Sequence, residues 1–467
     1  MTSRSLQVQQ QGIEVAGNNL ANVNNPAYAR QRLQINTSTS VQSQNGLIEG
    51  TGAEVSGIQQ IRNAVLDAQM VTENGVTGSL EAQQEALQYA QSDLGQTIDS
   101  GAAGAEGAAA ASVSGGQHAI GDAINNLFNS FQSLSTQPSS ITERDIVLNN
   151  AAQVADRFQE TDKRLEALNS SLNDGVVADV GQVNSLLTGI AQINQQITRA
   201  EATGGVANDL RDARQAKLED LGKLVKFDAT DGGGGAVNIS IGGVTMVDAT
   251  SVSDQLETYD AGGGKTMVRS ANTDAPLDIT SGHINGLIDA RDGAVQSLRD
   301  NLSNLASTMI TQINQLHQTG FGKDGSTGLN FFEGTNASDI KVNQALLDDP
   351  GKLAASDTSG DVGNNGIISK MADLAEATNP SLNNQTFSQN YSRTVADLGS
   401  ALSDANQKIS DQDAVTNLVK TQRDSVSGVS MDEEMADLVK YQRAYQASAQ
   451  VINTVNAMLQ SVLDMTR

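Results

Sequence analysis

The last stretch of the chain, from Ser430 to Arg467, carries a narrow apolar stripe. Apolar residues recur there at spacings of three and four, with one interval of seven at Gln442: Met431, Met435, Leu438, Tyr445, Ala449, Ile452, Val455, Leu459 and Val462. This period predicts a helix that packs on another helix. Ser430 and Glu433 match the S-x-x-E capping box that starts a helix. A stripe this narrow stabilises a helix little until a partner covers it, so the pattern predicts a partner helix.

A candidate partner lies at the other end of the chain. Leu6, Ile13 and Leu20 repeat at an interval of seven residues and predict a second amphipathic helix. This helix should end near Asn22, because Pro26 pushes the residue before it out of the α region. Two amphipathic terminal helices around a large middle predict a chain whose ends meet.

The first half of the middle is mostly helical in its pattern. Leu33 and Ile35 alternate with polar residues, which predicts an extended, turn-rich connector or a hairpin over 27–57 in preference to a plain linker. The region 101–116, rich in Ala and Gly, predicts a flexible loop. Helical spacing predicts helices over four ranges: 58–100 with an interruption at Gly75 and Gly78, 120–134, 141–200 as one long helix or two stacked ones, and 210–224.

The second half contains a change of period. Residues 226–282 alternate between apolar and polar positions and carry glycine-rich turns, which predicts a small β domain. Helical spacing resumes over 283–319, 367–374 and 387–424, with Phe331-Phe332 predicted as a buried anchor. Because the β domain interrupts the helices, the helices before and after it should share one core.

The predicted fold class is therefore mainly α. It is an elongated bundle of long helices with paired N- and C-terminal coiled-coil helices and a small inserted β domain. The corresponding division has three parts: a terminal helical domain of residues 1–57 and 425–467, a long-helix bundle of residues 58–225 and 283–424, and the inserted β domain of residues 226–282.

The composition excludes several classes of function. The 467 residues carry a net charge of −25, so nothing would neutralise the phosphates of a nucleic acid or favour an anionic membrane surface. No apolar run is long enough to cross a membrane, and the N-terminus lacks the pattern of a cleaved secretory signal. Cysteine is absent, which excludes disulfides and Cys-ligated metals. Such a chain fits the cytosol, or export by a route that does not cleave its substrate.

No group of residues supports catalysis or a cofactor. Gly262-Gly263-Gly264-Lys265-Thr266 resembles a phosphate loop, but the first glycine of that motif is missing and a strand follows where a helix is needed. Asp324-Gly325-Ser326 lacks the spaced ligands of a calcium loop. His118, His283 and His317 are far apart and are expected on surfaces or helix faces, not at a metal. The sequence predicts a protein that is not an enzyme, with no catalytic, cofactor-binding or metal site.

Both ends of the chain carry motifs that resemble those of a known family. Residues 18–32 are Asn-Asn-Leu-Ala-Asn-Val-Asn-Asn-Pro-Ala-Tyr-Ala-Arg-Gln-Arg, and residues 427–449 contain Ser-Gly-Val-Ser-Met-Asp-Glu-Glu and then Leu-Val-Lys-Tyr-Gln-Arg-Ala-Tyr-Gln-Ala-Ser-Ala. These motifs are similar to the terminal signatures of bacterial flagellar axial proteins (rod, hook and hook-associated). The Tyr-x-Arg-Gln form of the first motif and the order of the middle are most similar to the hook-associated protein 1 (FlgK) family. Two features depart from the family: Ala27 replaces a usual Gly, and the family usually begins a few helical turns earlier.

The resemblance implies a structural component of the flagellum that forms the junction between hook and filament and is needed for filament assembly. The implied partners are further copies of the chain in a ring, the hook protein, hook-associated protein 3 as the second junction protein, and an export chaperone on the C-terminal helix. Neither nucleic acid nor membrane is an implied partner. The implied location is extracellular, after type III export without a cleaved signal peptide. The terminal helices would order only on joining the axial structure.

The resemblance also implies that the terminal helices and their motifs form the assembly interface. The residues expected there are Leu6, Ile13, Asn18, Asn19, Leu20, Asn22, Pro26, Tyr28, Met435, Leu438, Tyr441, Tyr445, Ile452, Val455, Leu459 and Val462. Two alternatives stay open on the sequence alone. One is another flagellar axial protein, such as hook-associated protein 3 or the hook protein. The other is a secreted coiled-coil adhesin whose β domain binds a ligand.

Overall fold

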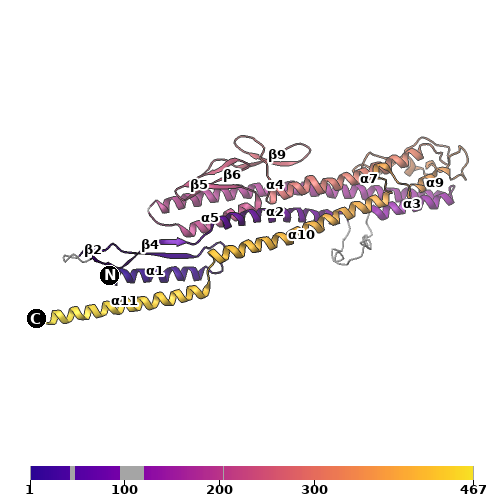
Figure 1. Ribbon diagram of the computed structural model, residues 1–467. Coiled ribbons are helices and arrows are strands. Elements are labelled where there is room, and N and C mark those ends of the chain that lie inside the picture. The colour runs from indigo at the N-terminus through magenta and orange to yellow at the C-terminus, as the bar shows by residue number, and fades with distance from the viewer. Residues whose placement is uncertain (1, 43–47, 95–119, 203, 466–467) are drawn as a thin grey trace.

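The computed structural model describes residues 2–42, 48–94, 120–202 and 204–465. The molecule is elongated, and both ends of the chain lie at the same end of it (Figure 1). A long helical bundle fills the other end, with a small group of strands on one side of it. The terminal helices and a β-hairpin form a second part, which we call the terminal core. The region where the terminal core meets the bundle is called the elbow below.

The bundle is built from long helices, as the sequence predicts. Its helical elements are α2 (Ala64–Asp93), α3 (Ile120–Thr136), α4 (Ile141–Glu201), α5 (Asn208–Leu224), α6 (His283–Asp289), a π-helical turn (Ala290–Val295), α7 (Gln296–His317) and α10 (Phe387–Ser427). The predicted loop at 101–116 lies outside the described residues, as does His118.

Helix α4 is one continuous helix of 61 residues, not two stacked ones. It begins after Ser140, whose hydroxyl accepts a hydrogen bond from the backbone N–H of Glu143 at 3.3 Å. Gly175 interrupts the apolar pattern in the sequence but not the helix. The glycine leaves room for the side chain of Leu287 on α6. The helices α3, α5 and α6 all pack on α4, which makes it the spine of the bundle.

A single apolar cluster runs along the bundle. It joins residues from before the β domain, such as Phe158 and Leu187, to residues from after it, such as Leu302 and Val395. All four side chains are buried. The prediction that the two halves share one core is therefore confirmed.

Short elements close the far end of the bundle. They are β11 (Phe332–Glu333), β12 (Lys341–Val342), α8 (Gln344–Asp348), a 3-10 turn (Pro350–Lys352), α9 (Gly366–Asp373) and a second 3-10 turn (Pro380–Leu382). Phe331 and Phe332 are fully buried here, as predicted, and the ring of Phe331 lies 5.6 Å from that of Phe131. His317, predicted on a surface or helix face, lies in this core and is only 1% exposed.

The inserted β domain lies along one side of α4 (Figure 1). Four strands form an antiparallel sheet in sequence order, and two more form a hairpin. The sheet strands are β5 (Asp228–Gly233), β6 (Ala236–Ile241), β7 (Val244–Asp248) and β8 (Ser251–Val252), and the hairpin strands are β9 (Leu256–Asp260) and β10 (Thr266–Ser270). The glycine-rich segment 262–264 is the turn of that hairpin, which agrees with the rejection of a phosphate loop.

Three asparagines of α4, spaced about three turns apart, fasten the β domain to the bundle. Each side-chain amide both donates to and accepts from the backbone of the β domain: Asn173 at Gly264 and Thr266, Asn184 at Leu256, and Asn194 at Val237 and Ala249. These amides satisfy backbone groups at the helix–sheet contact that would otherwise be buried without partners.

The terminal core consists of two helices and a hairpin. Its elements are α1 (Thr2–Ala21), β1 (Gln31–Thr37), β2 (Val41–Gln42), β3 (Ile48–Glu49), β4 (Ala53–Gln60) and α11 (Met431–Met465). Strands β1 and β4 pair antiparallel from Gln31↔Gln60 to Thr37↔Ala53, so the predicted hairpin is present. The register shifts between Gln34 and Ile35, where Ser56 of β4 has no partner, and the buried alternation of β1 ends there: Leu33 is buried and Ile35 is 44% exposed.

Two predictions near the start of α2 are wrong. Ile58 lies in strand β4 and Ile61 in the connector after it, so the helix begins at Ala64 and not at residue 58. Gly75 and Gly78 do not interrupt α2. They lie where the end of α5 crosses the helix. A side chain at Gly78 would collide with the backbone carbonyl of Lys223, so the glycine permits close packing of the two helices.

Candidate functional site

The two terminal motifs meet at Asn19, near the end of α1. Its side-chain N–H donates to Glu434 Oε2 and to the backbone carbonyl of Gln31, both at 2.9 Å. Its side-chain oxygen accepts from the Tyr28 hydroxyl and from the backbone N–H of Gln31, both at 2.9 Å. All four hydrogen bonds of the amide are made, and the residue is 1% exposed. Asn19 therefore joins α1, the loop after it, β1 and the start of α11.

Arg30 completes this cluster from the same loop. Its Nε lies 2.7 Å from Glu434 Oε1, and its Nη1 lies 2.6 Å from Glu433 Oε2. Glu433, which the sequence assigned to a capping box, thus reaches across to the N-terminal motif. The backbone N–H of Arg30 also donates to the carbonyl of Ser427 at the end of α10. Burial, with the nearby carboxylates of Asp209, Asp212 and Glu434, raises the pKa of Tyr28, so its hydroxyl stays protonated and donates to Asn19.

The seam between α1 and α11 is polar and closely packed. Ser5 and Ser448 face each other with hydroxyl oxygens 3.2 Å apart, and the ring of Tyr441 lies over Gly12. On its other side, α1 buries Val8 and Val15 against Leu33 of the hairpin. The two faces explain the part-exposed state of Leu6, Ile13 and Leu20, which lie beside the residues that contact α11 and the hairpin.

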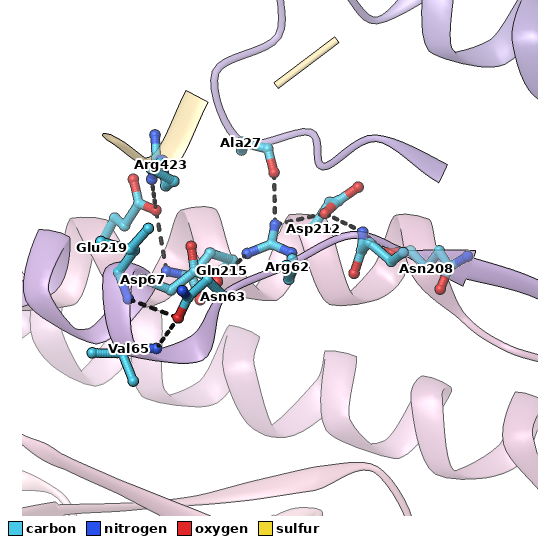
Figure 2. A network of polar contacts seen from close by, with 12 residues as sticks. Ala27, Arg62, Asn63, Val65, Asp67, Asn208, Asp212, Gln215, Glu219 and Arg423 are labelled. Carbon is cyan, nitrogen blue, oxygen red and sulfur yellow. Dashed lines mark hydrogen bonds and ion pairs between the residues drawn. The ribbon is translucent and has the colours of Figure 1, made fainter. Parts of the chain in front are cut away.

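A second polar network lies at the elbow, and Arg62 is at its centre (Figure 2). Its guanidinium contacts Asp67 of α2 at 3.0 Å, Asp212 of α5 at 2.6 Å and the carbonyl of Ala27 at 2.8 Å. Burial raises the pKa of Asp212, and the hydrogen bond from Arg62 acts in the opposite direction. Arg423 of α10 makes a parallel contact, with Glu219 at 2.7 Å and with the carbonyl of Pro26. The N-terminal motif is thus fixed to three helices of the bundle.

The far half of α11 lies beyond the N-terminal end of α1 (Figure 1). From Val455 onward every described residue of this helix is exposed. The exposed apolar side chains there include Val455, Leu459, Val462 and Leu463, with exposed fractions from 42% to 63%. On this half of α11, no other part of the described chain covers the predicted apolar stripe.

The structure places the predicted interface residues in three groups. Asn19 and Tyr28 are buried. Seven are part-exposed: Leu6, Ile13, Leu20, Asn22, Leu438, Tyr441 and Ile452. Seven are exposed: Asn18, Pro26, Met435, Tyr445, Val455, Leu459 and Val462.

Several residues of the site were absent from the predicted set, among them Glu433 and Arg423. Gly12, Arg30, Arg62 and Glu434 all make contacts that join the terminal core together or to the bundle. Arg30 and Glu434 lie within the two terminal motifs, so the motifs themselves were the available signal for these two residues. Nothing in the local sequence marks Arg62, because two of its three partners, Ala27 and Asp212, lie far from it along the chain.

The described ranges of the chain hold no group of three His, Asp or Glu side chains that could bind a metal ion. None of their helices is long and apolar enough to span a membrane.

Comparison with known proteins finds similarity to flagellar proteins along the whole chain. The model of the flagellar hook-associated protein FlgK helical domain matches residues 110–332, and that of the flagellar basal body rod FlgEFG protein C-terminal region matches residues 420–465. Flagellar hook-associated protein 1 of Bacillus subtilis is 25% identical and aligns over 99% of this chain and 96% of its own length. The chain is similar to flagellar hook-associated protein 1 from end to end. It is thus a structural component of the bacterial flagellum.

Other relatives agree with this result. Flagellar hook-associated protein 1 of Salmonella typhimurium is 23% identical over 98% of both chains. The solved structure of the flagellar hook junction protein FlgK from Burkholderia pseudomallei matches with a TM-score of 0.62 and 14% identity, and covers 77% of this chain and 100% of that one. The match to the solved Burkholderia pseudomallei structure confirms the mainly α fold with its small β insertion.

Proposed function

We propose that this chain builds the junction between the flagellar hook and the filament, and that filament growth requires it. The observation that carries the proposal is the contact between the two terminal motifs at Asn19 and Glu434, in a chain that aligns end to end with hook-associated protein 1. The role is mechanical, and we infer no enzymatic activity.

The three parts of the chain would divide this role. The terminal core (residues 1–57 and 425–467) would join the axial structure, and the bundle (residues 58–225 and 283–424) would form the wall around it. The β domain (residues 226–282) would face outward, because it lies on the side of α4 away from the terminal core and α10 (Figure 1). The boundary at residue 57 would move to Gln60, where β4 ends.

The exposed half of α11 supports a set of partners. Apolar side chains such as Leu459 and Val462 cannot offset the entropy of ordering this helix while they face water. Neighbouring copies in a ring, the hook protein and hook-associated protein 3 would cover them in the flagellum. An export chaperone would cover them in the cytosol, before type III export without a cleaved signal delivers the chain to the cell exterior.

Electron microscopy of a strain that lacks the gene tests this function, together with an assay of the growth medium for flagellin. We expect bare hooks and flagellin lost to the medium, and restored filaments when the wild-type gene is returned. Normal filaments in the deletion strain would contradict the proposal. Absence of hooks would assign the chain to the hook or rod instead.

Circular dichroism tests the proposed folding on assembly. The full chain and a chain that lacks residues 1–30 and 428–467 should show the same number of helical residues in solution, because α1 and α11 are unordered in the free monomer. Clear extra helix in the full chain would mean that the terminal core forms without partners.

A further inference from the structure

Three facing pairs define how α1 and α11 align. Ser5 faces Ser448, Gly12 faces Tyr441 and Asn19 faces Glu434. Each step is seven residues forward on α1 and seven residues back on α11. The two helices are therefore antiparallel and hold one heptad register along the whole of α1.

The first of these layers is poor at selecting that register, because Ser5 and Ser448 are both small. The second layer selects it in part, because the ring of Tyr441 fills the space that Gly12 leaves. A slip of one heptad would place Tyr441 opposite Ser5 or Asn19 instead. Tyr441 lies on a mostly exposed part of α11, so its ring can turn toward water and accommodate such a slip.

The third layer is different, because it buries a charge. Glu434 is 3% exposed; its Oε2 accepts a hydrogen bond from Asn19, and its Oε1 forms an ion pair with Arg30. A slip of one heptad in either direction would take Glu434 away from both partners. A buried carboxylate without partners is strongly unfavourable, so this layer penalises the slipped alignments more than the rest of the seam does.

We propose that Asn19, Arg30 and Glu434 form a register lock that selects a single antiparallel alignment of the terminal helices. Single buried polar residues are known to set register in paired helices. Arg30 and Tyr28 lie in the loop after α1, so the lock also fixes the path of the chain from α1 into β1. The inference rests on the proposed function only for the material in which it is tested.

Cysteine trapping can measure the register directly, because the chain has no cysteine of its own. One variant carries Ser5→Cys and Ser448→Cys, which report the observed alignment. The other carries Ser5→Cys and Val455→Cys, which report an alignment shifted by one heptad. Residues 448 and 455 are roughly 10 Å apart along the helix, so one alignment cannot join both to residue 5. The readout is the yield of the intramolecular 5–448 disulfide divided by the yield of the intramolecular 5–455 disulfide. Both yields are measured in isolated flagella by mass spectrometry.

The ratio should fall at least tenfold when Glu434→Ala is added to both reporters. Glu433→Ala is the matched control: it removes the neighbouring carboxylate, which also contacts Arg30 but is 63% exposed, and should leave the ratio within twofold. Glu434→Gln keeps an acceptor for Asn19 and should give an intermediate ratio. An unchanged ratio in Glu434→Ala, or an equal fall in Glu433→Ala, would overturn the register lock.

The failure of the lock and the failure of the proposed function can be told apart. Antibody labelling of the same flagella shows whether the chain lies at the end of the hook. Chain found at that position with a ratio insensitive to Glu434 would overturn only the lock. If no chain is found there, the junction function is contradicted, and the ratio measured in the isolated flagella, wherever the chain lies in them, still decides the lock.

Discussion

The bundle and the terminal core are held together in different ways. The bundle buries a continuous apolar cluster that includes six phenylalanines, and three asparagines of α4 attach the β domain to it. In the described part of the terminal core, the apolar cluster has only three buried members, Val8, Val15 and Leu33, and a charged network does much of the joining. The bundle can stabilise itself, whereas the terminal core depends on surfaces that the chain alone does not cover.

The elbow is held together in a third way. The contacts that join the terminal core to the bundle there are polar: the ion pairs of Arg62 and Arg423, and hydrogen bonds such as those from Gln31 to Asp209 and from Gln60 to Asp212. Ion pairs of this kind fix an orientation without adding much stability. The terminal core and the bundle should therefore respond separately to mutation.

The largest contrast is expected on the exposed half of α11. Changing Val455, Leu459, Val462 and Leu463 together to Ser should abolish filaments and motility, because the surface that partners cover is lost. The same variant should unfold thermally within about 2 °C of the wild type, since exposed side chains contribute little to the free energy of unfolding. Calorimetry and a motility assay measure the two effects. Filaments of normal number and length would contradict the assignment of this surface.

The reverse contrast is expected in the bundle core. Phe331→Ala should lower the free energy of unfolding by about 3–5 kcal/mol, because it opens a cavity beside Phe131 and Phe332. Urea unfolding followed by circular dichroism measures the change. Leu459→Ala, the matched control on α11, should cost less than about 0.5 kcal/mol in the free chain. A comparable cost at both positions would mean that α11 is packed in the monomer.

Acid should weaken the bundle through His317. Its Nε2 accepts from the backbone N–H of Ala354 and its Nδ1 donates to the carbonyl of Leu329, so the buried ring is neutral. Burial lowers its pKa to about 4. Between pH 6.5 and 4 the unfolded chain binds a proton that the folded chain does not, so stability falls as the pH falls, by roughly 3 kcal/mol in all. His317→Gln should remove this part of the pH dependence in urea titrations.

His283 provides the opposite control for that experiment. Its hydrogen bond to Asp179 raises its pKa above the ordinary value. Its contribution to stability is therefore complete below pH 6.5 and is lost as the pH rises through the folded-state pKa. His283→Gln should flatten the curve on the neutral side and leave the acid side unchanged. If both variants changed the same limb, the assignment of His317 would be wrong.

How far the sequence predicts this molecule depends on the range of the contacts. Periodicity predicted the long helices, the β insertion and the hairpin, because each is a local pattern. It could not show that Gly75 and Gly78 face the end of α5, or that Arg62 meets Asp212, because those partners are more than 140 residues away. In the candidate site, Asn19 and Tyr28 were predicted from a motif, but Glu434 as the partner of Asn19 follows only from the paired helices.

Two glycines give the finest test of the difference between the parts. At Gly78 a methyl group would collide with the backbone carbonyl of Lys223, which cannot move without displacing α5. Gly78→Ala should therefore cost about 1–3 kcal/mol, even after the gain in helix propensity. At Gly12 the methyl group would lie 2.6 Å from the ring of Tyr441, a side chain on a helix that is otherwise mostly exposed and can turn away. Gly12→Ala should change the urea unfolding of the free chain by less than about 0.5 kcal/mol, because the propensity gain offsets a contact that only the assembled terminal core requires. A loss at Gly12 as large as that at Gly78 would show that the α1–α11 seam is already rigid in the monomer.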